Sequence, residues 1–149
     1  MGKLKVLVVG YGNMGASHAR AYYTNSGFEL VGIVSRRSSE KRQQLAEELG
    51  NVSQFNGFDE ALQKTIPDVV SINSYTDTHK EYAIKSLHAG AHVFVEKPLA
   101  ETVEEAQEII DLAKDKNKKV VVGYILRQHP AWKKFITISH TLGTPLVMR

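Results

Sequence analysis

The sequence predicts a doubly wound α/β fold, in which six parallel strands form one sheet with helices on both faces. Two observations predict it. Apolar runs of strand length alternate with segments of helical period along the whole chain. The first apolar run, at residues 6–9, leads directly into a glycine-rich turn at residues 10–15. Because 149 residues suit one domain with a sizeable core, we expect a single sheet.

The expected elements follow one another in strict alternation. Strands are expected at residues 5–9, 30–35, 52–55, 69–73, 92–95 and 120–124, of which 52–55 is the weakest. Helices are expected at residues 14–25, 40–49, 59–65, 79–89, 103–116 and 130–142. Ala16, Ala19 and Tyr23 give the first helix one apolar face, and Gly50 is a typical stop for the second.

The later helices carry clearer end signals. Thr78 with Glu81, and Thr102 with Glu105, each match the capping box of a helix start, and Gly90 supplies a stop. The fifth helix should face the sheet with four residues spaced at helical period, Ala106, Ile109, Ile110 and Ala113. The last helix should begin at Pro130, which suits the first helical position, and turn Trp132, Phe135 and Ile136 inward.

The turn after the first strand predicts a dinucleotide site. It reads G-x-G-x-x-G, comprising Gly10, Tyr11, Gly12, Asn13, Met14 and Gly15. In this pattern the glycines permit a tight turn, close approach of a pyrophosphate and close packing of helix on strand. The helix that follows directs its unpaired N–H groups at the phosphates. A purely structural turn is the alternative interpretation.

The end of the second strand is where such a fold contacts the adenosine ribose. An acidic residue about 20 residues beyond the glycines favours NAD, whereas small donors and cations favour the 2′-phosphate of NADP. This chain has Ser35, Arg36 and Arg37 there, with Lys41 and Arg42 nearby. We therefore expect NADP as the preferred cofactor and NAD as the alternative. The alternative interpretation is that these basic residues form a solvent-exposed helix start with no contact to a cofactor.

Lys97 follows the fifth strand, at the edge of the sheet where ligands bind in open α/β folds. Its ammonium could donate to a substrate oxygen or take part in proton transfer. A lone lysine in a loop is more often a surface residue.

Composition excludes several classes of function. The chain has no cysteine, which rules out a disulfide framework and a thiolate metal site and fits a reducing cytoplasm. Its net charge of +3 is spread over several segments, so nucleic acid is not an expected partner. No apolar run approaches the length of a membrane span, so we expect no membrane partner. We also expect no bound metal.

Four motifs in order resemble one family. They are the glycine motif, the segment Ser74-Tyr75-Thr76-Asp77-Thr78-His79, Glu96-Lys97-Pro98, and Gly123-Tyr124 followed by Arg127 and Pro130. The chain resembles the glucose-fructose oxidoreductase, inositol dehydrogenase and rhizopine-catabolism family, written Gfo/Idh/MocA, over essentially all of its length. The Glu-Lys-Pro signature is the specific part.

The resemblance implies a cofactor domain of an NAD(P)-dependent dehydrogenase or reductase that acts on a sugar, cyclitol or related polyol. It implies that Lys97 bonds the substrate oxygen beside the nicotinamide, that Glu96 lies on the cofactor side, and that the Lys97–Pro98 bond can be cis. The predicted cofactor-binding set thereby extends to Ser74, Tyr75, Thr76, His79, Glu96, Lys97 and Arg127. A structural role at a helix start is an equally good interpretation of His79.

The chain departs from the family pattern at specificity positions. Ser74-Tyr75 replaces Thr-Pro, so that an aromatic ring could stack near the cofactor, and Gln128-His129 replaces an aromatic residue. Relatives also have a second α/β domain, which supplies an Asp and a His and often mediates homo-oligomers. We expect residues 1–142 to form the Rossmann domain and residues 143–149 to begin that second domain. A non-catalytic regulator and a redox-neutral, NAD-dependent glycosidase remain the alternative functions.

Overall fold

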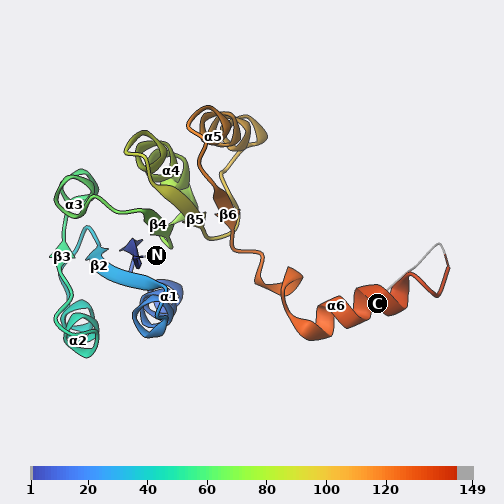
Figure 1. Ribbon diagram of the computed structural model, residues 1–149, viewed down its shortest axis with the longest axis horizontal. Coiled ribbons are helices and arrows are strands. Elements are labelled where there is room, and N and C mark those ends of the chain that lie inside the picture. The colour runs from blue at the N-terminus through green and yellow to red at the C-terminus, as the bar shows by residue number, and fades with distance from the viewer. Residues whose placement is uncertain (1, 144–149) are drawn as a thin grey trace.

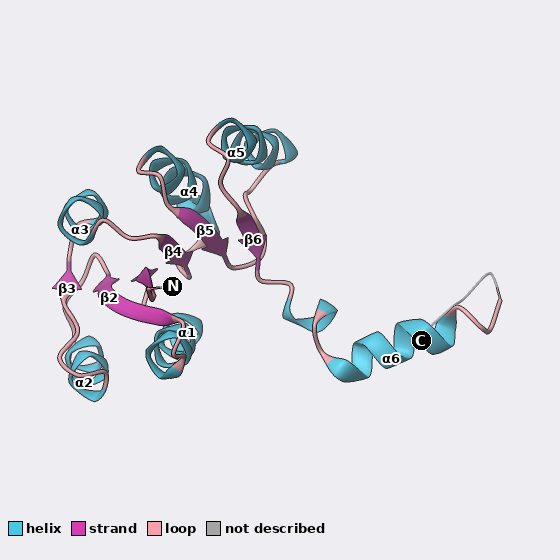
Figure 2. Cartoon of the chain, in the orientation of Figure 1, coloured by secondary structure: helices cyan, strands magenta, loops and turns pink. Residues whose placement is uncertain are grey.

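The computed structural model describes residues 2–143, which contain one six-stranded parallel sheet (Figures 1 and 2). In chain order the strands are β1 (Leu4–Val9), β2 (Phe28–Val34), β3 (Gln54–Phe55), β4 (Val69–Ile72), β5 (His92–Val95) and β6 (Val120–Val122). Their spatial order is β3-β2-β1-β4-β5-β6, and all neighbours are parallel. The predicted fold class and all six predicted strands are confirmed.

Helices cover both faces of the sheet. They are α1 (Asn13–Thr24), α2 (Glu40–Glu48), α3 (Phe58–Thr65), α4 (His79–His88), α5 (Val103–Asp115) and α6 (Pro130–Ser139), with short 3₁₀ turns η1 (Thr76–Thr78) and η2 (Ile125–Arg127). Figure 1 shows α1 and α2 on one face and α3, α4 and α5 on the other, while α6 extends beyond the β6 edge. Among the described residues no helix is long and apolar enough to cross a bilayer.

The core lies on both sides of the central strand β1. Val6, Leu7 and Val8 are fully buried, as expected for a parallel strand covered by helices on both faces. One apolar cluster lies under α3, α4 and α5, and a second lies under α1 and α2. The sheet is therefore a rigid platform whose carboxyl edge can position loops for function.

One predicted helix start is confirmed and one is wrong. The Thr102 hydroxyl accepts a hydrogen bond from the Glu105 amide and so caps α5. Thr78 makes no such cap, because the chain is already wound into η1 and its hydroxyl donates to the Tyr75 carbonyl instead. Gly50 and Gly90 have positive φ angles of 76° and 82°, as predicted for helix stops.

Some predicted inward faces are also wrong. Ile109 and Ala113 of α5 are buried, but Ile110 is 37% exposed, because it points away from the single sheet face that α5 covers. Tyr23 of α1 is likewise exposed. Trp132, Phe135 and Ile136 are exposed because α6 has no sheet beneath it within the described part of the chain. The strand expected to begin at residues 144–149 lies outside the described residues.

Candidate functional site

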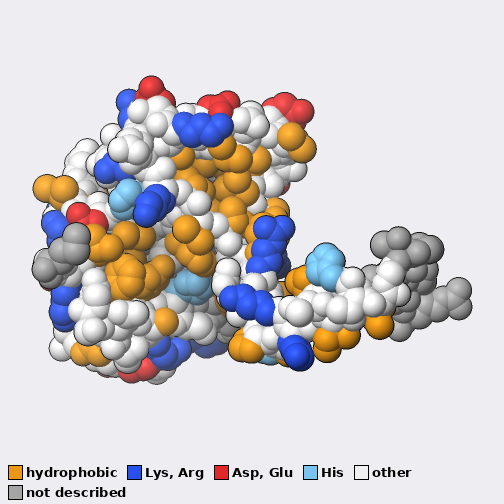
Figure 3. Space-filling view, turned by 45° about the vertical axis from the view of Figure 1, so that its right-hand side comes forward, with side chains coloured by type: hydrophobic (Ala, Val, Ile, Leu, Met, Phe, Trp, Pro, Cys, Tyr) orange, Lys and Arg blue, Asp and Glu red, His pale blue; other side chains and the backbone are white. Residues whose placement is uncertain are grey.

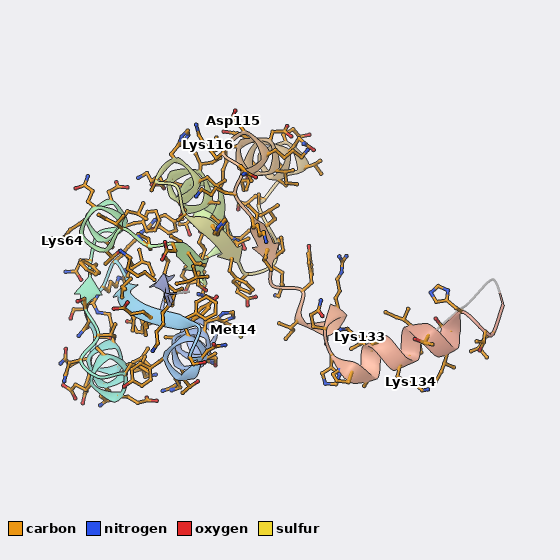
Figure 4. The ribbon with its side chains drawn as sticks, in the orientation of Figure 1. Met14, Lys64, Asp115, Lys116, Lys133 and Lys134 are labelled. Atoms are coloured by element: carbon orange, nitrogen blue, oxygen red, sulfur yellow. The ribbon has the colours of Figure 1, made fainter. Side chains whose placement is uncertain are left out.

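The main cavity lies where the sheet reverses its winding. β1 and β4 are neighbours, yet the chain leaves β1 toward one face through α1 and leaves β4 toward the other through η1 and α4. At the carboxyl ends of these strands and of β2 lies a cavity of about 780 Å³. Ten predicted cofactor residues line it: Gly10, Tyr11, Gly12, Asn13, Met14, Ser35, Arg36, Arg37, Ser74 and Tyr75. Figure 4 shows Met14 on α1, facing away from α2.

The three glycines of the turn differ in what surrounds them. Gly10 has a φ of +89°, and a Cβ there would lie 2.6 Å from the Asn73 carbonyl oxygen. A Cβ on Gly15 would lie 2.2 Å from the Gly10 carbonyl oxygen. Gly12 has an ordinary φ of −58° and nothing within 4 Å of an added Cβ. Gly10 and Gly15 are thus required by the protein's own packing, whereas Gly12 leaves open space in the cavity wall.

The polar groups around this open space suit a dinucleotide. Gly12 is the N-cap residue of helix α1 and has no side chain that could cap the helix. The first-turn amides of α1 are therefore donors for an anion. The Asn73 side chain donates through Nδ2 to the Ser71 carbonyl, but its buried Oδ1 has no partner among the described residues. That oxygen is an acceptor suited to a ligand hydroxyl or amide. The donors and the acceptor together fit phosphate and sugar groups.

The turn after β2 places the positively charged Arg36 in the wall of the cavity. The Ser35 amide donates to the Phe55 carbonyl at 3.0 Å, and the Ser35 hydroxyl lies 3.3 Å from the Arg37 carbonyl oxygen. Tyr82 on α4, together with the carboxylates of Asp77 and Glu81, raises the pKa of the Arg36 guanidinium above its usual value. A permanent positive charge therefore lies between the β2 and α4 sides of the cavity.

The Glu96-Lys97-Pro98 segment follows β5 on the same edge of the sheet but outside the main cavity. Lys97 is exposed, and the Lys97–Pro98 peptide is cis, which confirms the expectation from the resemblance. Glu96 is 8% exposed. Its Oε1 lies 3.2 Å from His18 Nε2 on α1, and its Oε2 accepts from the Lys97 amide at 3.3 Å. The Glu96 carboxylate thus fixes the backbone that carries Lys97.

Gly123 lies behind this carboxylate. A Cβ at Gly123 would lie 3.0 Å from Glu96 Oε1, so the absence of a side chain at the end of β6 makes room for the buried Glu96.

Three further predicted residues lie outside the cavity. His79 is 1% exposed, and its ring nitrogens contact the carbonyl oxygens of Pro98 at 2.8 Å and Ser74 at 3.1 Å. Those contacts match the structural interpretation of His79, which ties the loop after β4 to the loop after β5. Thr76 is half-buried in η1. The exposed Arg127 lies over the Tyr124 ring, 5.0 Å from its centre.

Sequence reasoning missed several residues that line the cavity, namely Asn56, Phe58, Asn73, Asp77, Thr78 and Tyr82. Asn56 and Asn73 each directly follow a strand, so the position of a strand end was a usable signal. Tyr82 gave no such signal, because its place on α4 also fits the core face. No cluster of three or more possible metal ligands occurs among residues 2–143.

The comparisons with known proteins agree with this geometry. Residues 4–124 match the Gfo/Idh/MocA oxidoreductase family, which is described by an NAD-binding Rossmann fold. The chain is 39% identical to D-glucoside 3-dehydrogenase of Escherichia coli over 122 residues, covering 81% of this chain and 34% of that protein. It is 34% identical to UDP-N-acetylglucosamine 3-dehydrogenase of Acidithiobacillus ferrooxidans over 124 residues, covering 83% and 38%.

A solved structure shares the same architecture. The scyllo-inositol dehydrogenase of Lactobacillus casei, with bound NAD(H) and scyllo-inositol, superimposes with a TM-score of 0.83 at 26% identity. The match covers 95% of this chain and 42% of that one. The chain therefore spans about two fifths of the length of the relatives that it matches.

Proposed function

This chain belongs to the Gfo/Idh/MocA family of oxidoreductases, and we propose that it binds the dinucleotide in an enzyme that moves hydride between nicotinamide and a sugar, cyclitol or related polyol. The observation that carries the proposal is the cavity at the switch point of the sheet, with the glycine turn on one side and Lys97 on the same sheet edge. Relatives named as glucoside and inositol dehydrogenases support the substrate class.

The chain's own groups divide the work of binding and catalysis. The α1 amides and Gly12 would hold the pyrophosphate, and Ser35 and Arg36 would hold the adenosine ribose. The bound nicotinamide supplies the hydride acceptor or donor. The Lys97 ammonium donates to the substrate oxygen and stabilises negative charge that develops on it, while Glu96 keeps the Lys97 backbone in place.

Within this proposal NADP is the preferred cofactor. A 2′-phosphate gains from cations and small donors, and the β2 end offers Arg36, Arg37 and the Ser35 hydroxyl to the cavity. NAD is the alternative. Assembly into a homo-oligomer through a further domain belongs to the same proposal and is supported by the family resemblance.

Two other functions compete with the dehydrogenase. A non-catalytic regulator would bind the dinucleotide without turnover, and a redox-neutral glycosidase would cleave a glycoside without net change in the cofactor. The exposed Lys97 after β5 favours catalysis over mere binding, because its ammonium could stabilise the negative charge that develops on a substrate oxygen during hydride transfer.

The test is an assay of the intact protein, of which this chain is the proposed cofactor domain, with NADP⁺ or NAD⁺ and a panel of sugars and cyclitols, followed by the absorbance of reduced nicotinamide. Lys97→Met should lower kcat by about 100-fold or more, with the Kd for cofactor within about twofold of the unmodified protein. Lys64→Met is the matched control, because Lys64 is an exposed α3 residue paired with Glu60. Full activity of Lys97→Met would remove Lys97 from the mechanism. Glycoside hydrolysis without net reduction, or binding with no turnover, would replace the proposal by one of the two alternatives.

A further inference from the structure

Arg42 is a buried cation with no carboxylate partner among the described residues. It is 5% exposed and lies in the first turn of α2. None of the ion pairs within residues 2–143 includes it. A buried charge is costly unless it is compensated, and the first turn of a helix disfavours a cation further. The position of this charge therefore calls for a physical reason.

The hydrogen bonds of Arg42 direct its guanidinium at the carboxyl ends of β2 and β3. Nη1 donates to the Ser35 carbonyl at 3.0 Å and to the Phe55 carbonyl at 3.3 Å, and Nε donates to Gln54 Oε1 at 3.0 Å. All three acceptors are neutral. The charge is thus held in place by hydrogen bonds, yet no anion of the protein neutralises it in the described structure.

The Ser35 carbonyl that Arg42 binds belongs to the cavity wall. Ser35, Arg36 and Arg37 line the cavity, and Arg42 lies directly behind this turn. A buried charge is screened less by salt than an exposed one, so it acts on a nearby ligand more strongly than a surface lysine does. The missing counter-charge is supplied if the ligand itself carries an anion at this turn.

We propose that Arg42 is a specificity-determining, positioning residue, whose buried positive charge behind the Ser35 turn favours a phosphate dianion on the ribose 2′ position. This inference rests on the proposed dinucleotide function and deepens it. Arg42 acts through Ser35 and through its field, whereas Arg36 reaches into the cavity itself.

Gln54→Glu separates the charge of Arg42 from its structural role. A carboxylate at position 54 can still accept from Arg42 Nε, and the substitution loses only the exposed hydrogen bond that Gln54 Nε2 donates to Gln43 Oε1. The protein should therefore keep its fold, while the buried charge becomes neutralised. The probes are 2′,5′-ADP and 5′-AMP, measured by calorimetry at low salt on the full chain. We expect the Kd for 2′,5′-ADP to rise by about fivefold or more and that for 5′-AMP to change by less than about twofold.

Three further variants complete the experiment. Gln44→Glu adds the same charge on the exposed side of α2 and should leave the ratio of the two Kd values within about twofold. Arg42→Lys keeps the charge and should largely keep the ratio, whereas Arg42→Met should lose it. If Arg42→Met does not fold, Gln54→Glu and Arg42→Lys still decide between charge and structure.

The outcomes distinguish this inference from the proposed cofactor preference. An unmodified protein that binds 5′-AMP as tightly as 2′,5′-ADP contradicts the NADP preference, and the response to Gln54→Glu still reports whether Arg42 acts on the 2′-phosphate. An unchanged ratio in Gln54→Glu, or equal weakening of both probes, overturns the role of Arg42. Binding of neither probe to the unmodified protein overturns the dinucleotide site and this inference together.

Discussion

At the scale of single residues, the glycine turn combines two kinds of requirement in one motif. Gly10 and Gly15 face backbone oxygens of the protein at distances that no Cβ can tolerate. Gly12 lines the cavity and has an ordinary φ of −58°. A Cβ added to Gly12 would have no atom within 4 Å. Folding therefore demands two of the glycines, and the proposed dinucleotide binding accounts for the third.

This difference predicts opposite phenotypes for two alanine substitutions. Gly15→Ala should destabilise the fold by about 2 kcal/mol or more, because the Gly10 carbonyl oxygen must move away from the new methyl group. Gly12→Ala should leave the unfolding temperature unchanged within about 2 °C but weaken dinucleotide binding by about tenfold or more. Thermal unfolding and calorimetry with NADPH measure the two effects. Normal NADPH binding by Gly12→Ala would show that the pyrophosphate lies elsewhere.

Sequence predicted several cavity residues that stand at strand ends, although it missed Asn56 and Asn73 there, and it could not predict those that only the tertiary structure brings in. Ser35 and Arg36 were predictable because the topology of a doubly wound sheet places the end of β2 at the cavity. Tyr82 was not, because a helical period shows that a residue faces the sheet but not that it lines the same cavity as Arg36. Two interpretations of His79 were equal in the sequence, and only the carbonyls of Ser74 and Pro98 distinguish them.

At the scale of elements, strands and helices were predicted well because buried parallel strands are continuous apolar runs that cannot be mistaken for loops. The Thr78 cap failed for a local reason. The capping pattern requires extended backbone at the first residue, whereas Thr78 has ψ near −7° and continues η1 into α4. Sequence signals for helix starts thus depend on the segment that precedes them.

The pairing of β5 with β6 includes a titratable contact. His92, the first residue of β5, accepts a hydrogen bond from the Lys119 amide at Nδ1, 3.0 Å away. Burial lowers the pKa of His92, Lys118 and Lys119 lower it further, and Asp68 opposes them. The unfolded chain therefore binds a proton at His92 more readily than the folded one, so stability is lost as pH falls below the ordinary histidine pKa.

We predict that His92→Asn reduces the acid sensitivity of the fold. The asparagine Oδ1 can accept the same hydrogen bond but does not titrate, so stability near pH 7.5 should change by about 1 kcal/mol or less. The loss of stability between about pH 7.5 and about pH 5.5 should be smaller than in the unmodified protein. Urea unfolding at both pH values measures this. An identical pH dependence in both proteins would exclude His92 as a contributor.

At the scale of the whole molecule, the body formed by the sheet and α1 to α5 is distinct from the α6 arm. Figure 3 shows hydrophobic side chains along this arm beside basic ones, and Figure 4 places Lys133 and Lys134 on it. Trp132 and Phe135 pack edge to face at 5.6 Å yet remain exposed. Helical period predicted an apolar face correctly, but it carries no information on which surface covers that face.

The separation of body and arm predicts that the body is stable without the arm. The main contact of α6 is with η2, its neighbour in the chain, and both core clusters are built from residues that precede it. A chain ended after Gln128 should therefore unfold within about 2 °C of the 149-residue chain, because little buried apolar area is lost. It should also bind less of a dye that reports exposed apolar surface, since Phe135 and Ile136 are removed. Scanning calorimetry and dye fluorescence provide both readouts. A fall of more than about 5 °C would mean that α6 packs on the body in solution, and the arm would then belong to the domain that holds the cofactor.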